Sequence, residues 1–318
     1  MKLGLDVMGG DFAPDATIKG AILTLKEIPA SDRIVLIGDE EIIKSKLEEF
    51  KADLNDFDIV HAPDVIGMGE KPIKAFTQKP ESSINIGFKL LKSKKIDAFS
   101  SAGNTGATLV GAMYSVKAIP GVIRPCTAGL FPKENGGLTL LLDIGTNPDS
   151  KPDVLYQFAI LGSIFMKTIY NIKNPKVGLL NIGEEEEKGN LQCQATFQLM
   201  QDTTDFNFVG NVESRELFKD KVDIIVCDGF IGNIVLKQIE AMYRLMDKRN
   251  LLDDYFKKFN YENYGGTPIL GVNMPVVIGH GISSDVAIKN MILQSREICV
   301  NKLAHKIKLA FSKHSQAS

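Results

Sequence analysis

The chain has few features that would set it apart from ordinary globular proteins, and each absence excludes a class. No stretch has the ~18–20 consecutive apolar residues that a membrane-spanning helix needs. A formal net charge of −2 at pH 7 gives no electrostatic reason to expect nucleic acid as a partner. The cysteines lie apart, without Cys-x-x-Cys spacing, so we expect buried, reduced thiols in a cytosolic protein and no zinc site. They are Cys126, Cys193, Cys227 and Cys299.

Three familiar motifs are also missing. No G-x-x-x-x-G-K followed by Ser or Thr occurs, so a nucleotide-binding P-loop is not indicated. The pair Gly67 and Gly69 has Pro72 where a G-x-G-x-x-G motif needs its third glycine. No G-x-S-x-G segment supplies a serine nucleophile. The sequence therefore indicates neither a nucleotide nor a dinucleotide site, and it gives no support for a serine hydrolase.

What is present is a regular alternation of short apolar runs and longer helical patterns over 318 residues. Continuous apolar runs indicate strands that are covered on both faces, as in parallel sheets. We therefore predict an α/β fold, a mostly parallel sheet with helices on both faces. The expected strands are 2–7, 34–38, 57–62, 96–101, 138–145, 177–183, 207–212, 223–229 and 275–280. Amphipathic helices are expected at 40–50 and 154–169.

Glycine and proline at 119–121 and 264–268 mark candidate boundaries between lobes. On this basis we predict two lobes, one formed by residues 1–119 with 265–318 and the other by 120–264. A long amphipathic pattern at 239–264 predicts a helix that packs against a partner subunit, with interfacial membrane contact as the alternative.

Most strands run directly into small polar residues and glycine. In open α/β sheets the carboxyl ends of the strands form the ligand-binding crevice. The turn SSAGNTG (100–106) places Asn104 and Thr105 at a helix start, where free N–H groups suit an anion such as phosphate. Gly103 and Gly106 would let the backbone approach that anion, although an ordinary capped turn is the alternative.

Three further stretches carry candidate chemistry. In NIGEEEEKGN (181–190) the acidic run fits a solvated helix start, whereas Lys188 beside a flexible turn could neutralise a bound oxyanion or phosphate. DIGTNPDSKP (143–152) lacks a complete set of metal ligands and predicts a polar ligand-binding turn, with an ordinary Asx-type turn as the alternative. His280 and Asp285 have the H-x-x-x-x-D spacing of glycerolipid acyltransferases, but His280 could equally line a pocket or cap a turn.

Eight segments, in order along the whole chain, resemble the bacterial phosphate acyltransferase family. They are VMGGDFAP (7–14), SSAGNTGA (100–107), LLDIGTNPDSKP (141–152), GLLNIGEEEEKGN (178–190), FVGNVESR (208–215), CDGFIGNIVLK (227–237), YGGTPILG (264–271) and IGHGISSD (278–285). In that family the segment between the sixth and seventh motifs is often longer. Here only 26 residues separate Lys237 from Tyr264, which weakens the expectation of membrane contact.

The resemblance implies a fold similar to the phosphotransacetylase and isocitrate/isopropylmalate dehydrogenase group, a homodimer, and neither metal nor organic cofactor. It implies transfer of a fatty acyl group from acyl-acyl-carrier protein to inorganic phosphate, early in phospholipid synthesis. The expected location is the cytoplasm, with peripheral contact to the inner face of the membrane left open. Two other functions remain: a short-chain phosphotransacetylase that uses acyl-CoA, and a non-catalytic scaffold that binds acyl-carrier protein.

Phosphate is already a competent nucleophile, so the expected tasks of the protein are positioning and oxyanion stabilisation. The catalytic candidates are Lys188, Asn233 as donor to the carbonyl oxygen, and His280. The candidates for binding phosphate or substrate are Asp6, Gly9, Gly10, Asp11, Gly103, Asn104, Thr105, Gly106, Asp143, Asn147 and Asp228.

Overall fold

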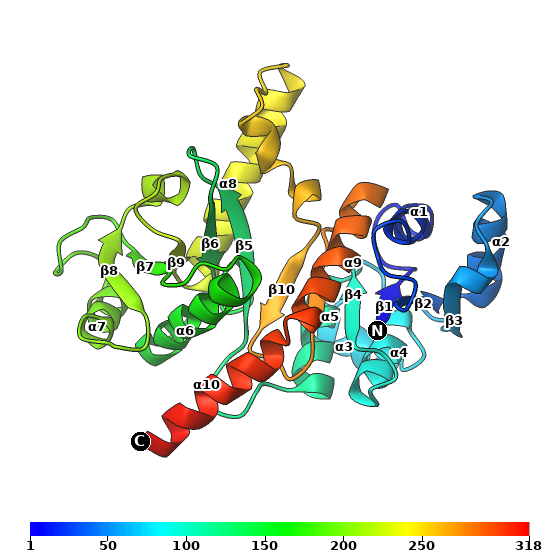
Figure 1. Ribbon diagram of the computed structural model, residues 1–318, viewed down its shortest axis with the longest axis horizontal. Coiled ribbons are helices and arrows are strands. Elements are labelled where there is room, and N and C mark those ends of the chain that lie inside the picture. The colour runs from blue at the N-terminus through cyan, green and yellow to red at the C-terminus, as the bar shows by residue number, and fades with distance from the viewer. Residues whose placement is uncertain (318) are drawn as a thin grey trace. The chain divides into compact units, whose positions relative to one another are not determined.

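The computed structural model describes residues 1–317, with side chains through residue 312, and divides into two compact units (Figure 1). Unit 1 comprises residues 1–118 and 261–304, and unit 2 comprises residues 119–260 and the chain from His305. The sequence predicts that the residues from His305 belong to the first lobe, whereas the structure groups them with unit 2. The lobe boundaries remain a prediction. Each unit is built around its own sheet.

The unit 1 sheet has the strand order β3-β2-β1-β4-β11-β10. All neighbours are parallel except β10 and β11, which pair antiparallel. The strands are β1 (Lys2–Asp6), β2 (Arg33–Gly38), β3 (Phe57–His61), β4 (Ala98–Ser101), β10 (Thr267–Leu270) and β11 (Val276–Ile278). The apolar runs of β1 and β2 are buried along almost their whole length, as parallel strands covered on both faces require.

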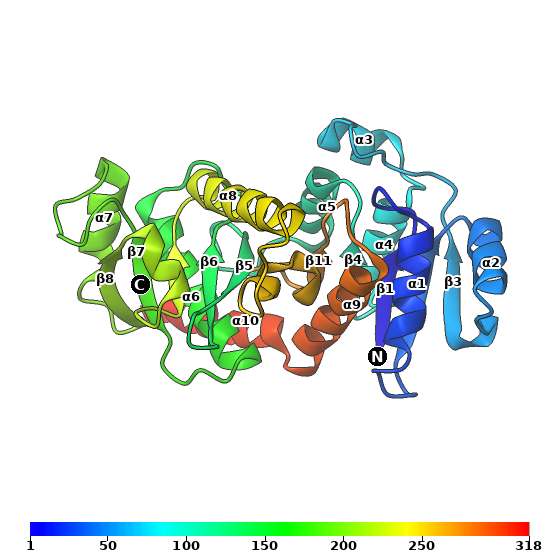
Figure 2. The same ribbon diagram turned by 90° about the horizontal axis from the view of Figure 1, so that it is seen from above.

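Helices cover both faces of this sheet (Figure 2). Helices α1 (Asp15–Thr24) and α9 (Asp285–Val300) pack together, and α4 (Ser83–Lys92) packs on β1, β2 and β4. Phe88 of α4 meets Phe99 of β4 with ring centroids 5.0 Å apart. Gly87 permits this contact, because a Cβ there would lie 2.1 Å from the Phe99 ring. The remaining helices are α2 (Glu40–Glu49), α3 (Pro72–Gln78) and α5 (Thr105–Gly111).

The unit 2 sheet has the order β5-β6-β9-β7-β8. Strands β5 and β6 form an antiparallel hairpin, and the remaining neighbours are parallel. The strands are β5 (Cys126–Pro132), β6 (Leu138–Leu142), β7 (Lys176–Leu180), β8 (Asn207–Val212) and β9 (Ile224–Val226). The helices are α6 (Pro152–Ile169), α7 (Leu191–Met200) and α8 (Gly229–Lys248); α10 (Leu303–Ala317) begins at the end of unit 1 and its residues from His305 belong to unit 2.

The predicted fold class is confirmed, since each sheet is mostly parallel and helices lie on both sides of the sheet. The prediction of one helix over 239–264 is wrong beyond Lys248, where α8 ends. Asn250 adopts a positive φ of 56°, a left-handed conformation that breaks an α-helix and that asparagine tolerates better than most residues. The rest of that segment forms only short 3-10 turns, at Phe256–Phe259 and Tyr261–Asn263.

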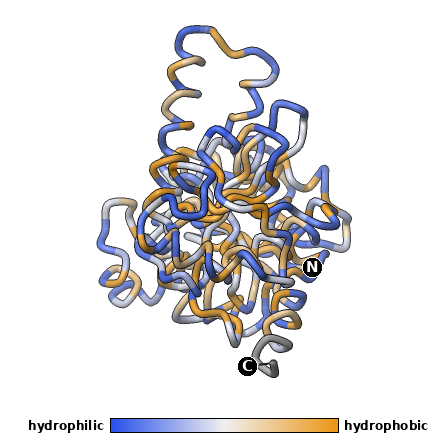
Figure 3. The backbone as a smooth tube through the Cα atoms, turned by 90° about the vertical axis from the view of Figure 1, so that its left-hand side faces the viewer, coloured by the Kyte–Doolittle hydropathy of each residue, from blue (hydrophilic) through white to orange (hydrophobic). Residues whose placement is uncertain are grey.

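In Figure 3 the far end of α8 and the segment after it carry hydrophobic and hydrophilic residues mixed together. Met242 and Leu245 of α8 are about half exposed. A helix that keeps apolar side chains in solvent on its outer face is typical of one that has a partner.

An ion-pair cluster at the amino edge of the unit 1 sheet gives a stability prediction. Asp58 accepts hydrogen bonds from the Lys2 ammonium (2.8 Å) and from the Arg33 guanidinium (3.1 Å). The bond from Lys2, together with that from Arg33, lowers the pKa of Asp58 below 3.8, although burial acts in the opposite direction. Asp58→Asn should lower the free energy of unfolding by about 0.5–1 kcal/mol at pH 7, because the pairs are partly exposed. Since the folded-state pKa is lowered, this stability is present above pH 3.8 and is lost as the pH falls through the folded-state value. Urea unfolding at pH 7 and pH 3 measures it, with exposed Asp56→Asn as control; an equal difference at both pH values contradicts the assignment.

Candidate active site

The small-residue turns gather at the carboxyl edge of each sheet. In unit 1 the parallel strands β1, β4 and β11 end at the same edge, and in unit 2 β6, β7 and β9 do so. The predicted gathering of strand ends is therefore observed within each sheet. The candidate residues therefore form two groups, one on unit 1 and one on unit 2.

In unit 1, Asp6 lies at the end of β1 and is fully buried. Its carboxylate accepts hydrogen bonds from the Ser101 hydroxyl at 2.7 Å and from the Met8 amide at 3.1 Å. Ser101 in turn accepts from the Gly103 amide. Burial raises the pKa of Asp6, against the opposing effect of the hydrogen bonds it accepts. Asp6 thus ties the turn after β1 to the turn after β4, and Ser101 is a member of this group that sequence reasoning missed.

The Asn104 side chain is buried and already occupied by the protein. Its Oδ1 accepts from the Ala107 amide at 3.0 Å, which caps α5, and its Nδ2 donates to the carbonyls of Gly67, Met68 and Glu70 at 3.0–3.2 Å. These bonds fix the 67–70 loop against the start of α5. Any anion at this turn would therefore meet the exposed Thr105 and the first backbone amides of the helix.

The glycines of unit 1 permit loops to pack on one another. A Cβ on Gly9 would lie 2.4 Å from Asp6 Oδ2 and 2.7 Å from the Gly103 backbone, and one on Gly106 would lie 2.3 Å from Pro72. Gly10 has a φ of 110°, which favours glycine. Close packing inside the protein is thus the observed reason for glycine at positions 9, 103 and 106.

Asp11 and His280 lie at neighbouring turns of the same edge. The Asp11 amide donates to the Gly281 carbonyl at 2.7 Å, which joins the turn after β1 to the turn after β11. His280 is half-buried, and its ring centroid lies 4.9 Å from that of Tyr261. Asp285 is the first residue of α9, and its carboxylate accepts from the Val286 amide.

In unit 2, Asp143 follows β6 and is fully buried. Its Oδ1 accepts from the Thr127 amide and hydroxyl and from the Thr146 amide, and its Oδ2 accepts from the amide and side chain of Asn147. The distances are 2.6–3.3 Å. The carboxylate therefore organises the 143–147 turn, while the Asn147 side chain also donates to the Pro125 carbonyl. Thr127 lies on β5, a strand that sequence reasoning missed.

The start of α8 lies against this turn. A Cβ on Gly232 would lie 1.9 Å from the Asp143 carbonyl oxygen, and one on Gly229 would lie 2.8 Å from Asp143 Oδ2. Asn233 is exposed, and a Cβ placed on Gly145 would lie 3.7 Å from its Cβ. The two helix glycines thus bring Asn233 beside the 143–147 turn.

Two asparagine side chains, one from the loop and one from β8, hold the 181–190 loop in place. The Asn181 side chain donates to the Lys188 carbonyl at 3.0 Å, and the Asn211 side chain donates to the Glu185 carbonyl at 2.8 Å. Lys188 itself is exposed, and Glu184 pairs with Lys221 at 2.7 Å. The backbone that carries Lys188 is thus held, and its ammonium faces solvent.

Four strand-end residues prove to be helix caps. Each accepts a hydrogen bond from the amide three residues on and so begins a helix. They are Asn104 for α5, Asn190 for α7, Asp228 for α8 and Ser284 for α9. The side chains of these residues fix loop geometry, which leaves backbone amides and the exposed Thr105, Lys188 and Asn233 to meet a ligand.

The cysteines do not offer a nucleophile. Burial raises the pKa of the Cys126 and Cys227 thiols well above 9.0 and also raises the pKa of Cys193. A neutral thiol is a poor nucleophile. Within residues 1–317, no three His, Cys, Asp or Glu side chains come together as a metal-binding group. Nor is any helix of that same range long and apolar enough to cross a bilayer.

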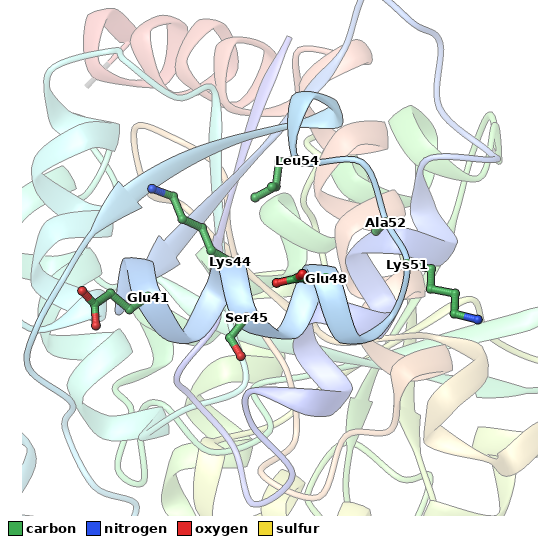
Figure 4. Close-up of a pocket in the computed structure, with 7 residues that line it drawn as sticks. All are labelled: Glu41, Lys44, Ser45, Glu48, Lys51, Ala52 and Leu54. Atoms are coloured by element: carbon green, nitrogen blue, oxygen red, sulfur yellow. The ribbon is translucent and has the colours of Figure 1, made fainter.

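A surface hollow beside α2 differs in kind from these strand-end groups. It is lined by Glu41, Lys44, Ser45, Glu48, Lys51, Ala52 and Leu54. Figure 4 shows these side chains spread along the helix and the loop after it, without converging on one point. Lys44 pairs with Glu40 at 2.6 Å on the surface. Solvated charges of both signs on an outer helix do not make a substrate site.

The fold belongs to the α/β class that includes solved phosphotransacetylases. The chain resembles a phosphotransacetylase from Streptococcus pyogenes with a TM-score of 0.65 at 17% identity, over 94% of both chains. It also resembles the EutD phosphotransacetylase from Staphylococcus aureus, with a TM-score of 0.62 at 15% identity over 93% of this chain and 94% of that one. At such identities the likeness establishes the fold.

The sequence narrows this class to one family. Residues 1–248 match the family described as fatty acid synthesis protein. The chain is 42% identical to the phosphate acyltransferase of Dictyoglomus turgidum over an alignment of 326 residues, which covers 96% of each chain. It is 40% identical to the phosphate acyltransferase of Halothermothrix orenii over an alignment of 336 residues, which covers 99% of this chain and 100% of the relative. The chain belongs to the phosphate acyltransferase family, as its motifs predicted, and is an acyltransferase.

Proposed function

We propose that the protein transfers a fatty acyl group from acyl-acyl-carrier protein to inorganic phosphate and so supplies acyl phosphate for phosphatidic acid synthesis. The observation that carries this proposal is the 42% identity to a phosphate acyltransferase over 96% of the chain. The structure supports it with turns of small residues at the carboxyl edge of both sheets. The proposed reaction needs neither a metal nor an organic cofactor.

The proposed chemistry is a direct displacement. A phosphate oxygen attacks the thioester carbonyl carbon, and an O–C bond forms as the carbonyl becomes an oxyanion. The oxyanion then collapses, the C–S bond breaks, and the carrier leaves as a thiolate that takes a proton from solvent. Phosphate is nucleophilic at neutral pH, so positioning can supply ~7–11 kcal/mol of barrier reduction without a covalent enzyme intermediate.

In unit 2 we assign two side chains to the reacting groups. Asn233 donates to the carbonyl oxygen as it becomes negative, and Lys188 neutralises anionic charge. Both side chains are exposed, and the backbone that carries each is fixed by contacts within the protein. Asn233 lies at the start of α8, where glycines pack against the 143–147 turn, and Lys188 lies in the 181–190 loop, which the Asn181 side chain holds. Asp143, Asn147 and Asp228 are positioning residues, because their side chains bond to the protein itself.

In unit 1, Thr105 and the first amides of α5 are a separate candidate for binding phosphate, with Gly103 and Gly106 as the flanking glycines. Asp6 and Asn104 position this turn, and the 9–11 turn packs against it. His280, beside Tyr261 at the same sheet edge, is a further catalytic candidate.

Comparison of two acyl donors tests the function. Purified protein is mixed with phosphate and either palmitoyl-carrier protein or acetyl-coenzyme A, and free thiol is measured. We expect thiol release from the carrier substrate only. Release from acetyl-coenzyme A alone would indicate a short-chain phosphotransacetylase. Binding of the carrier without phosphate-dependent thiol release would indicate a scaffold.

We also propose a homodimer formed through α8. Ile234, Met242 and Leu245 are each about half exposed. At about 100° per residue they fall within an arc of roughly 80°, the narrow apolar stripe of a helix that packs on a partner helix. The exposed face of α8 is thus suited to a second copy of the chain.

Charge placed in that stripe should separate the dimer. Leu245→Glu should raise the dimer dissociation constant about 30-fold or more, since burying an unpaired carboxylate at an interface costs at least ~2 kcal/mol. Sedimentation equilibrium measures it. Asp247→Lys, on the opposite side of the same helix, is the matched control. Dimerisation that is unchanged by Leu245→Glu, or a wild-type monomer, contradicts this interface.

For localisation we propose the cytoplasm, with peripheral contact to the inner membrane face. The segment after α8 supports such contact, because it exposes Leu251 and Phe256 close to Lys248, Arg249 and Lys258. Apolar side chains beside cations suit an anionic bilayer surface.

A further inference from the structure

A pocket of about 430 Å³ lies at the carboxyl edge of the unit 2 sheet. Its floor is formed where β7 and β9 end, and its walls come from α6, the first turn of α7 and the first turns of α8. The apolar lining includes Leu155, Leu179, Leu180, Cys193, Ile231 and Val235. The volume lies within the ~300–1,000 Å³ typical of small-molecule sites.

The polar side chains at its rim are largely engaged by the protein. Asn190 Oδ1 accepts from the Cys193 amide, and Asp228 Oδ1 accepts from the Ile231 amide. The Asn181 side chain donates to the Lys188 carbonyl and accepts from the Ile182 amide. With these groups paired and the walls apolar, the pocket suits a hydrocarbon better than a polar ligand.

Apolar residues also stand in solvent at the pocket's edge. Ile182, which lines the pocket, is 82% exposed. Leu191 is 84% exposed and lies between two lining residues, Asn190 and Gln192. Neither side chain gains from this exposure, and together they extend the apolar surface outward from the pocket.

The same segments carry the proposed catalytic side chains. Lys188 immediately precedes the lining residues Gly189 and Asn190. Asn233 belongs to the same turns of α8 as the lining residues Ile231 and Val235, but at about 100° per residue its side chain leaves the helix on the opposite side. An acyl group bound near Lys188 therefore has an apolar pocket next to the same loop for its tail. We infer that this pocket binds the hydrocarbon chain of the acyl donor; the inference rests on the proposed function.

Filling the pocket tests this assignment. Cys193→Phe places an aromatic ring in the space that the methylenes would occupy. Each methylene displaced from an apolar site costs about fourfold in binding. The ratio of kcat/KM for palmitoyl-carrier protein to kcat/KM for octanoyl-carrier protein should therefore fall about tenfold or more. Leu199→Phe, at an exposed position of the same helix, should leave that ratio unchanged.

A labelling experiment on the wild-type protein needs neither turnover nor a variant. Cys193 is half-buried at the pocket, so its alkylation by N-ethylmaleimide can be followed by mass spectrometry. Without phosphate, palmitoyl-carrier protein should slow this alkylation at least about tenfold, whereas carrier protein without an acyl chain should not. The alkylation rate of Cys193 in the protein without any carrier is the reference.

The outcomes separate the pocket from the function. An unchanged chain-length ratio in folded Cys193→Phe, equal protection by carrier with and without the acyl chain, or no protection at all overturns the pocket assignment. Absence of phosphate-dependent thiol release from the wild type overturns the proposed function instead. Acyl-dependent protection of Cys193 would support the pocket even in that case.

Discussion

Replacing Asn233 with alanine is expected to lower kcat for phosphate-dependent thiol release by about 10²–10³-fold, with a smaller change in KM. Loss of one donor to a developing oxyanion has this size, ~2.7–4 kcal/mol, because the donor acts on charge that exists only in the transition state. Asn233 is exposed on α8 beside the 143–147 turn, and its truncation leaves Gly229 and Gly232, which seat the helix, in place. Steady-state kinetics with palmitoyl-carrier protein measures the effect.

The matched control is Lys248→Ala, at the far end of the same helix, which should keep kcat within about twofold. A thermal melt of Asn233→Ala that coincides with the wild-type melt excludes unfolding as the cause. Near-normal kcat in a folded Asn233→Ala protein would remove Asn233 from the mechanism. An effect confined to KM would assign it to ground-state binding instead.

Asp143→Asn is expected to lower the free energy of unfolding by about 3–5 kcal/mol. The buried carboxylate accepts five hydrogen bonds. They come from the backbone amides of Thr127, Thr146 and Asn147, from the Thr127 hydroxyl and from the Asn147 side chain. A carboxamide can accept only on its oxygen, so its NH₂ group would face N–H donors and leave buried polar groups unpaired. Urea unfolding followed by circular dichroism measures the loss.

Asp149→Asn provides the comparison, because Asp149 is exposed in the same loop and should change stability by no more than about 0.5 kcal/mol. If Asp143→Asn were as stable as Asp149→Asn, Asp143 would not be the residue that organises this turn. The assignment of Asp143 as a positioning residue would then be wrong.

Most of the parallel strands could be predicted because they are continuous apolar runs. Two strands could not. The sequence CTAGLFP of β5 contains glycine and proline, and TPIL of β10 lies inside a segment that glycine and proline mark as a boundary. Both pair antiparallel to a neighbour, β5 with β6 and β10 with β11. Their pairing partners, not their own composition, make them strands.

The positions of the strand-end turns were predictable, and the contacts within them were less so. The rule that parallel strands present their carboxyl ends at one edge predicted where the turns of each sheet gather. Sequence could not show that the Asn104 amide would be occupied by the 67–70 loop, since that contact spans more than 30 residues. Nor could it show that CDGFIGN opens a helix whose glycines pack on Asp143.

The apolar pocket had one sequence signal, which was easy to miss. Ile182 and Leu191 stand at either end of the acidic run in NIGEEEEKGNL, where solvated residues would be expected. Both are more than four-fifths exposed. The remaining lining comes from α6, β7, the turn after β9, Ser214, α7 and α8, which only the fold brings together.

The central claim is that inorganic phosphate itself attacks the acyl thioester. Incubation of the protein with palmitoyl-carrier protein and fully ¹⁸O-labelled phosphate, followed by mass spectrometry of the acyl product, tests it most directly. The account predicts palmitoyl phosphate that retains every labelled oxygen, formed at the rate at which free thiol appears. Thiol release at the same rate without phosphate, with unlabelled palmitate as the product, would contradict it.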